Sequence, residues 1–300
     1  MAFRRCRLDC RVLHHLSGVH AMIELISDRE LWNWWSPVWL VAAAVAITYG
    51  RYPGWTTRTK TFWLISGLSI WVFAFVSPLG VLADGFLFSA HMIQHLLMLL
   101  VVPLCLVLSL PPSAARATHS VAVHDGSLRQ NVRRLIASPI AGWLLGLGAM
   151  WFWHVPAFCS AATENYMIGV VRTGTFLASG VLFWWPIYSP QKQTQLPASS
   201  AVVYLFSACL GCTLLGIYIT FTTITVCPAF ASPQERLAIM IALHDAGMTA
   251  SVDQQLGGLL MWVPPCSLYI AAIVSVLCRW YAVDQPGELG LPVTRTVETR

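Results

Sequence analysis

Long apolar runs separated by short polar connections dominate the chain. Seven of them approach the roughly 20 residues that a helix needs to cross a bilayer. These runs occupy Trp34–Tyr49, Thr61–Leu82, Phe88–Leu110, Pro139–Phe158, Val170–Tyr188, Ala201–Val226 and Gln255–Tyr281. They lack the alternation of barrel strands, and a helix satisfies each backbone amide within its own segment. The pattern predicts an all-α fold, a polytopic membrane helical bundle with about seven transmembrane helices.

The composition agrees with lipid as the solvent. Of the 300 residues, 57% are hydrophobic and 10% are charged, whereas a soluble domain carries about 25% charged residues. The net charge of +5 does not indicate a nucleic-acid partner, because the basic residues lie in short loops between apolar runs.

We expect the transmembrane domain to span residues 32–282, between an extension at 1–31 and a cytoplasmic tail at 283–300. The extension carries arginines at positions 4, 5, 7 and 11 and lacks the long apolar stretch of a signal peptide. We hypothesise that the native protein begins at Met22, which amino-terminal sequencing would test.

The distribution of Lys and Arg predicts the orientation. The Ser77–Phe88 loop has no basic residue, and the Cys227–Gln254 loop has only Arg236. The opposite loops and the tail hold Arg51, Arg58, Lys60, Arg116, Arg129, Arg133, Arg134, Lys192, Arg295 and Arg300. Because basic loops stay in the cytoplasm, we expect an external amino terminus and a cytoplasmic carboxyl terminus in a bacterial plasma membrane. The arginines of the extension oppose this orientation if the chain begins before them.

The nine cysteines do not suggest a disulfide framework. Cysteines inside apolar runs usually behave as small hydrophobic residues. Cys209-Leu-Gly-Cys212 has redox or metal spacing, but it lies within an apolar run, which favours packing. The cysteines inside apolar runs are Cys105, Cys209, Cys212, Cys266 and Cys278.

The third predicted span begins with a pair of histidines. His91 and His95 stand at i and i+4 and therefore share one face of a helix, and Met98 follows on nearly the same stripe. Two imidazoles with a thioether nearby suit copper, and the sulfur makes zinc less favoured. The alternative is that both histidines only hydrogen-bond neighbouring helices, but their pairing favours a metal or cofactor.

Further candidates lie at the ends of other spans. His154 precedes Pro156 at the end of the fourth span, where an interfacial histidine is the alternative. Asp253 and Met261 lie roughly on one side of the seventh span, and Asp253 could orient a ligating histidine or cap its own helix. His244 adds a weaker ligand in the preceding loop. The topology places all of them at one membrane face, which predicts a shallow, externally open polar site between helices.

Several motifs follow one another in a characteristic order. They are Ser77-Pro78-Leu79, the stretch 87–98 with His91 and His95, Trp153-His154-Val155-Pro156, the stretch 182–186, and the stretch 253–262 that begins Asp-Gln-Gln-Leu-Gly-Gly. From about Ser77 to Trp280, this series resembles the CtaG family of cytochrome c oxidase assembly factors, the Bacillus-type integral-membrane group.

The resemblance implies a seven-helix protein that helps to build a haem–copper oxidase by placing copper in it. It carries family roles onto His91, His95, His154 and Asp253, with oxidase subunits and periplasmic copper chaperones as partners. One position departs from the family pattern. Where a second spaced histidine pair is expected in the fifth span, this chain has Gly169 and Thr173 with Arg172 between them. A cation there opposes copper binding, so metal binding would be weaker, His244 would be used instead, or the role would differ.

We therefore expect an assembly factor that transiently holds Cu(I) at the external face and passes it to an oxidase subunit. The sequence shows no arrangement typical of an enzyme. Three alternatives remain. A copper permease would continue its ligands through the bilayer, for which Met98 and Cys105 are weak hints. A haem-binding oxidoreductase would use His95 and His154 as axial ligands. A scaffold would bind oxidase subunits without metal.

Overall fold

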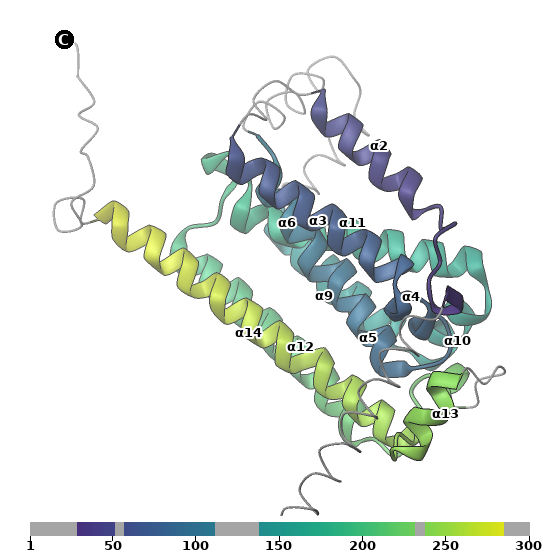
Figure 1. Cartoon of the computed structure of the whole chain (residues 1–300). Coiled ribbons are helices and arrows are strands. Elements are labelled where there is room, and N and C mark those ends of the chain that lie inside the picture. The colour runs from purple at the N-terminus through teal and green to yellow at the C-terminus, as the bar shows by residue number, and fades with distance from the viewer. Residues whose placement is uncertain (1–28, 52–56, 112–137, 232–237, 285–300) are drawn as a thin grey trace, which may run out of the picture.

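The computed structural model describes residues 29–51, 57–111, 138–231 and 238–284 (Figure 1). The proposed start at Met22 and most of the predicted tail lie outside these residues. Within the described ranges, the regular structure is helical throughout, which confirms the all-α prediction. The helices are α2 (Val38–Gly50), α3 (Arg58–Val76), α4 (Pro78–Ala83), α5 (Phe88–Leu96), α6 (Val102–Ser109), α9 (Pro139–Trp153), α10 (Pro156–Glu164), α11 (Tyr166–Tyr188), α12 (Ala198–Phe221), α13 (Ala238–Asp245) and α14 (Ala250–Asp284).

Five helical segments of the described chain are long and apolar enough to cross a membrane on their own. They are α3, the continuous stretch Phe88–Ser109, α11, α12 and α14. A sixth span results if α9 and α10 are counted together. The first expected span is the apolar helix α2, whose 13 residues fall short of the roughly 20 that a bilayer requires.

The fourth expected span is bent rather than straight. The axes of α9 and α10 differ by 77°. Pro156 begins α10 and cannot donate a backbone hydrogen bond, and the preceding Val155 is extended, as steric clash with a following proline requires. His154 is the last residue of the first half, at the C-cap of α9. The break therefore places this histidine at a corner of the bundle.

The third span lies at the centre of the bundle. In its most apolar 18-residue stretch, 72% of the residues are buried, against 28–39% in the corresponding stretches of the other four spans. The turn Leu97–Val101 is a π-helix that joins α5 to α6. The backbone oxygen of Leu100 in this turn accepts a hydrogen bond from the indole of Trp184 on α11, at 2.9 Å. A π-turn frees backbone groups that neighbouring helices then satisfy.

Helices α12 and α14 run side by side, as Figure 1 shows. Two glycines allow this close approach, because a Cβ on Gly216 would collide with Trp262 and a Cβ on Gly258 would collide with Thr220. Gly257, next to Gly258, faces α5 instead, and a Cβ there would collide with the ring of Phe88. Small residues commonly mediate such packing in membranes, and here they bring α14 against both α12 and α5.

Candidate functional site

Three buried histidines converge where α5 meets the corner between α9 and α10. The ring centroids of His91 and His95 are 4.1 Å apart, and those of His95 and His154 are 5.4 Å apart. All three side chains are at most 4% exposed. The structure thus brings together the three histidines that the sequence pattern placed at one membrane face.

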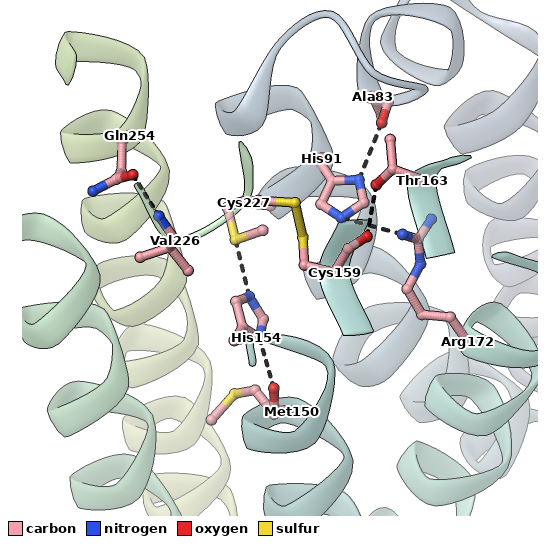
Figure 2. Close-up of a disulfide and its surroundings, with 11 residues drawn as sticks. Ala83, His91, Met150, His154, Cys159, Thr163, Arg172, Val226, Cys227 and Gln254 are labelled. Atoms are coloured by element: carbon pink, nitrogen blue, oxygen red, sulfur yellow. Dashed lines mark hydrogen bonds between the residues drawn. A yellow bond between two sulfur atoms is a disulfide. The ribbon is translucent and has the colours of Figure 1, made fainter. Parts of the chain in front are cut away.

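His91 has both ring nitrogens engaged. Its Nδ1 lies 3.0 Å from the backbone oxygen of Ala83, which can only accept, so Nδ1 carries the proton (Figure 2). In the neutral ring Nε2 is then an acceptor, and Nη1 of Arg172 donates to it across 3.4 Å. The lone pair that could bind a metal therefore faces a guanidinium.

His154 presents its free lone pair to a sulfur atom. Its Nδ1 donates to the backbone oxygen of Met150 at 2.6 Å (Figure 2). Nε2 is then unprotonated in the neutral ring, and it lies 3.2 Å from the Sδ of Met92. A thioether cannot donate a hydrogen bond, so two electron-pair donors face each other. Such a pair suits a shared cation.

His95 lies between the other two histidines. Neither of its ring nitrogens has a hydrogen-bond partner within the described part of the chain, although both are buried. The ring packs against Phe176, with centroids 4.6 Å apart. Leaving a buried polar group unsatisfied costs about 1–3 kcal/mol. An imidazole held at this cost, with both nitrogens open, fits a residue that binds a ligand.

The available donors are therefore the unprotonated ring nitrogen of His95, Nε2 of His154 and Sδ of Met92. Among the described residues, no three His, Cys, Asp or Glu side chains are grouped so that they could hold a metal on their own. A metal held by three ligands here would therefore need the thioether of Met92. Two neutral imidazoles and one thioether form a soft donor set that is compatible with Cu(I).

The methionine beside the histidines is Met92, whereas the sequence pattern predicted Met98 and Met261. Met98 is buried in the core within the π-turn. Met261 is buried on α14, and its backbone oxygen accepts a hydrogen bond from Cys212. His244 is exposed on α13, unlike the three buried histidines. Met92 was overlooked although it precedes His95 by three residues and so shares its helix face.

Asp253 has neither of the two roles considered for it. Its carboxylate accepts hydrogen bonds from the backbone amides of Phe88, at 2.6 Å, and Ser89, at 2.9 Å. Asp253 therefore caps the first turn of α5. The helix in which Asp253 lies, α14, is capped by Thr249, whose hydroxyl accepts from the amide of Val252. A carboxylate at a helix N-terminus is favoured by the helix dipole. Asp253 thereby fixes the helix that carries His91 and His95.

The departure in the fifth span places a positive charge beside the histidines. Arg172 on α11 is 7% exposed, and its charge interacts with that of Asp84 in the α4–α5 loop. The hydroxyl of Thr173 donates to the backbone oxygen of Gly169 at 3.0 Å, within α11 itself. Neither Gly169 nor Thr173 offers a nitrogen ligand, so the donors come from α5 and the end of α9.

A disulfide lies beside the histidines, although the sequence pattern did not suggest that the cysteines form disulfides. Cys159 of α10 is bonded to Cys227 (Figure 2), which is the N-cap of the short helix Pro228–Phe230. Phe230 packs against the ring of His91, with centroids 4.9 Å apart. The disulfide thus ties the segment that covers His91 to α10. Both cysteines lie at the ends of apolar runs on the predicted external side.

A polar cavity of about 130 Å³ lies next to this cover. Its wall includes Asp253 and Gln254 of α14, the disulfide-bonded Cys227, and the rings of Phe88 and Phe230. Phe230 packs on the ring of His91, and Phe88 packs on Phe230. Hydrophilic side chains therefore reach to within one aromatic layer of the histidines.

Residues 34–282 match a family model described as cytochrome c oxidase caa3 assembly factor (Caa3_CtaG). The chain belongs to this family. The match covers the helical bundle and every residue of the site, and it confirms the resemblance noted from the ordered motifs. Membership in the caa3 assembly factor family agrees with the five described helices that are long and apolar enough to cross a membrane.

Other comparisons add little to the family assignment. An uncharacterized protein of Mycobacterium leprae (strain TN) is 22% identical over 263 residues, which is 81% of this chain and 38% of that protein. The chain thus spans less than half the length of this relative. No solved structure matches the chain.

Proposed function

We propose that this caa3 assembly factor carries Cu(I) as cargo for cytochrome c oxidase and binds it through His95, His154 and Met92. The observation that carries the proposal is the pair of open nitrogens on buried His95, beside the facing lone pairs of His154 Nε2 and Met92 Sδ. The recipient is an oxidase subunit, and periplasmic copper chaperones are the expected donors.

The donor set suits cargo that is handed on. All three ligands are neutral, so the bound ion is not held by an opposite charge. Arg172 adds repulsion from its place beside His91. A divalent ion would feel twice the repulsion of a monovalent one, and the thioether also favours Cu(I). Modest affinity permits transfer to a stronger site in the oxidase.

The disulfide supports an external position for this site. Disulfides form and persist in oxidising compartments and are rare in the cytosol. Cys159 and Cys227 lie beside the histidines, and the loops on this side are poor in Lys and Arg. Both features favour a bacterial plasma-membrane protein with its amino terminus outside and its carboxyl terminus in the cytoplasm.

A metal-free scaffold is the second candidate. The hydrogen bond from Arg172 to His91 favours it, because an internal cation already occupies one face of the histidine cluster. In this case the histidines would only shape the surface that binds oxidase subunits. The haem alternative has less support, since His154 Nε2 points at Met92 and His95 packs on Phe176.

One set of variants separates these functions. Cu(I) affinity would be measured by competition with a chromophoric chelator for the purified wild type, His95→Ala and His244→Ala, alongside caa3 oxidase activity in cells. We expect His95→Ala to lose both copper binding and oxidase activity. His244→Ala, which alters an exposed histidine, should retain both. Loss of oxidase activity with unchanged Cu(I) binding would contradict the copper role and favour the scaffold.

A further inference from the structure

Two thiols meet between α12 and α14, away from the histidine site. The Sγ of Cys209 on α12 lies 2.8 Å from the Sγ of Cys266 on α14. The hydroxyl of Thr213 lies 3.2 Å from the Cys266 sulfur. Cys209 stands near the middle of the 24-residue helix α12, which places the pair well inside the membrane-spanning part of the bundle.

The neighbouring Cys212 has a structural role that the pair does not share. Pro265 lies inside α14 and has no backbone N–H, so the carbonyl of Met261, four residues earlier, lacks its helical partner. The thiol of Cys212 donates to this oxygen at 2.9 Å. An unsatisfied carbonyl is costly in a bilayer, which accounts for Cys212. Cys209 and Cys266 instead hydrogen-bond to each other at 2.8 Å, and the Cys266 thiol also reaches the backbone oxygen of Cys209 at 3.9 Å.

The two helices are held together independently of these thiols. Gly216 packs against Trp262, and Gly258 packs against Thr220. Gly216 and Thr220 both follow Cys209 along α12. These contacts hold α12 against α14 without help from the sulfur atoms of Cys209 and Cys266.

We propose that Cys209 and Cys266 form a second Cu(I) site inside the bilayer; the identity of the ion rests on the proposed function. Soft thiolate ligands select Cu(I), and two sulfur ligands on opposite sides of the ion suffice, so the thiols, which are in contact without it, turn apart when the ion binds. Zinc requires about four ligands, which the pair does not supply. The site is neutral when one thiol releases its proton to water and binds as thiolate while the other binds as a thiol. A neutral site avoids the cost of a net charge in lipid.

Helix α14 connects the two sites. A Cβ on Gly257 would lie 3.1 Å from Cγ of Met92, so α14 approaches the histidine site at this glycine, and the helix rises about 14 Å from there to Cys266. The thiol pair thus lies deeper in the helical bundle than the histidines. Helix α14 carries Cys266 and also packs against the histidine site. The pair provides a second position for the same cargo within one bundle.

The test counts Cu(I) bound to the full-length protein in detergent under anaerobic conditions. The variants are Cys209→Ser with Cys266→Ser, His95→Ala with His154→Ala, and the control Cys105→Ser, which alters a free buried cysteine on α6. We expect the cysteine double variant to lose one Cu(I) and to keep the one bound by histidines, which also shows that it is folded. The control should bind as the wild type does.

X-ray absorption at the copper edge identifies the ligands in each variant. The histidine double variant should retain copper with sulfur ligands alone, whether or not the histidine site proves to bind copper. Unchanged stoichiometry in the cysteine double variant would overturn the thiol site and leave the proposed function intact. A Cys209–Cys266 disulfide, found by alkylation and peptide mapping of native membranes, would also overturn it.

Discussion

Arg172 donates a hydrogen bond to Nε2 of His91 across 3.4 Å, so a fixed cation stands at the edge of the histidine cluster. This hydrogen bond occupies the remaining lone pair of His91, which is then not available to a metal. The copper ligands proposed here are therefore the residues that this guanidinium leaves free. Removing the charge changes both the ligand set and the electrostatic repulsion.

Replacing Arg172 should strengthen copper binding. Arg172→Leu removes the positive charge and frees Nε2 of His91 without adding a ligand, so we expect Cu(I) affinity to rise on the order of 10–100-fold. Arg172→Lys is the matched control, because it keeps the charge and should leave affinity near the wild-type value. Chelator competition measures both. An unchanged affinity in Arg172→Leu would show that the guanidinium does not oppose binding.

Met92 and Met98 provide a direct comparison of two thioethers on one span. Met92→Leu preserves volume, so the cost in stability should stay below about 1.5 kcal/mol. It removes the sulfur that faces His154, and we expect Cu(I) affinity to fall by about tenfold or more. Met98→Leu, within the π-turn, should not change affinity. Equal effects of both substitutions would argue against Met92 as a ligand.

Asp253→Asn should destabilise the protein through α5. The substitution keeps a side-chain oxygen but removes the negative charge that faces the backbone amides of Phe88 and Ser89, which should cost about 1 kcal/mol. Thermal unfolding in detergent would record the loss. Ser251→Ala changes a nearby cavity-lining residue and should have little effect. If Asp253→Asn abolishes copper binding without loss of stability, the aspartate is a ligand rather than a cap.

The helices were largely predictable because each depends on a local apolar run. The third span was expected at Phe88–Leu110 and is observed at Phe88–Ser109. The fourth span was expected to continue through Pro156 to Phe158, and the 77° bend before this proline was not predicted, because it depends on what α10 packs against. The length of α2 was also predicted incorrectly. The apolar run begins at Trp34, but the helix begins only at Val38.

The site was predictable only where helix periodicity decides it. Spacing alone paired His91 with His95. Met92 joins the site through His154, which approaches from another helix, and no local pattern contains that contact. The same holds for Arg172 beside His91 and for the Cys159–Cys227 disulfide, whose partners are 68 residues apart. Contacts between segments distant in sequence require the fold.

Two exposed loop positions offer a test of orientation in intact cells. Thr223 lies in the loop that leads to Cys227, and Lys192 lies in the loop between α11 and α12. If the histidine site faces outward, Thr223→Cys should react with a membrane-impermeant maleimide in intact cells, and Lys192→Cys should react only after the cells are permeabilised. The native Cys159 and Cys227 are buried, and mass spectrometry would assign each labelled cysteine. Labelling of Lys192→Cys in intact cells, with Thr223→Cys protected until permeabilisation, would reverse the orientation and place the proposed copper site on the cytoplasmic side.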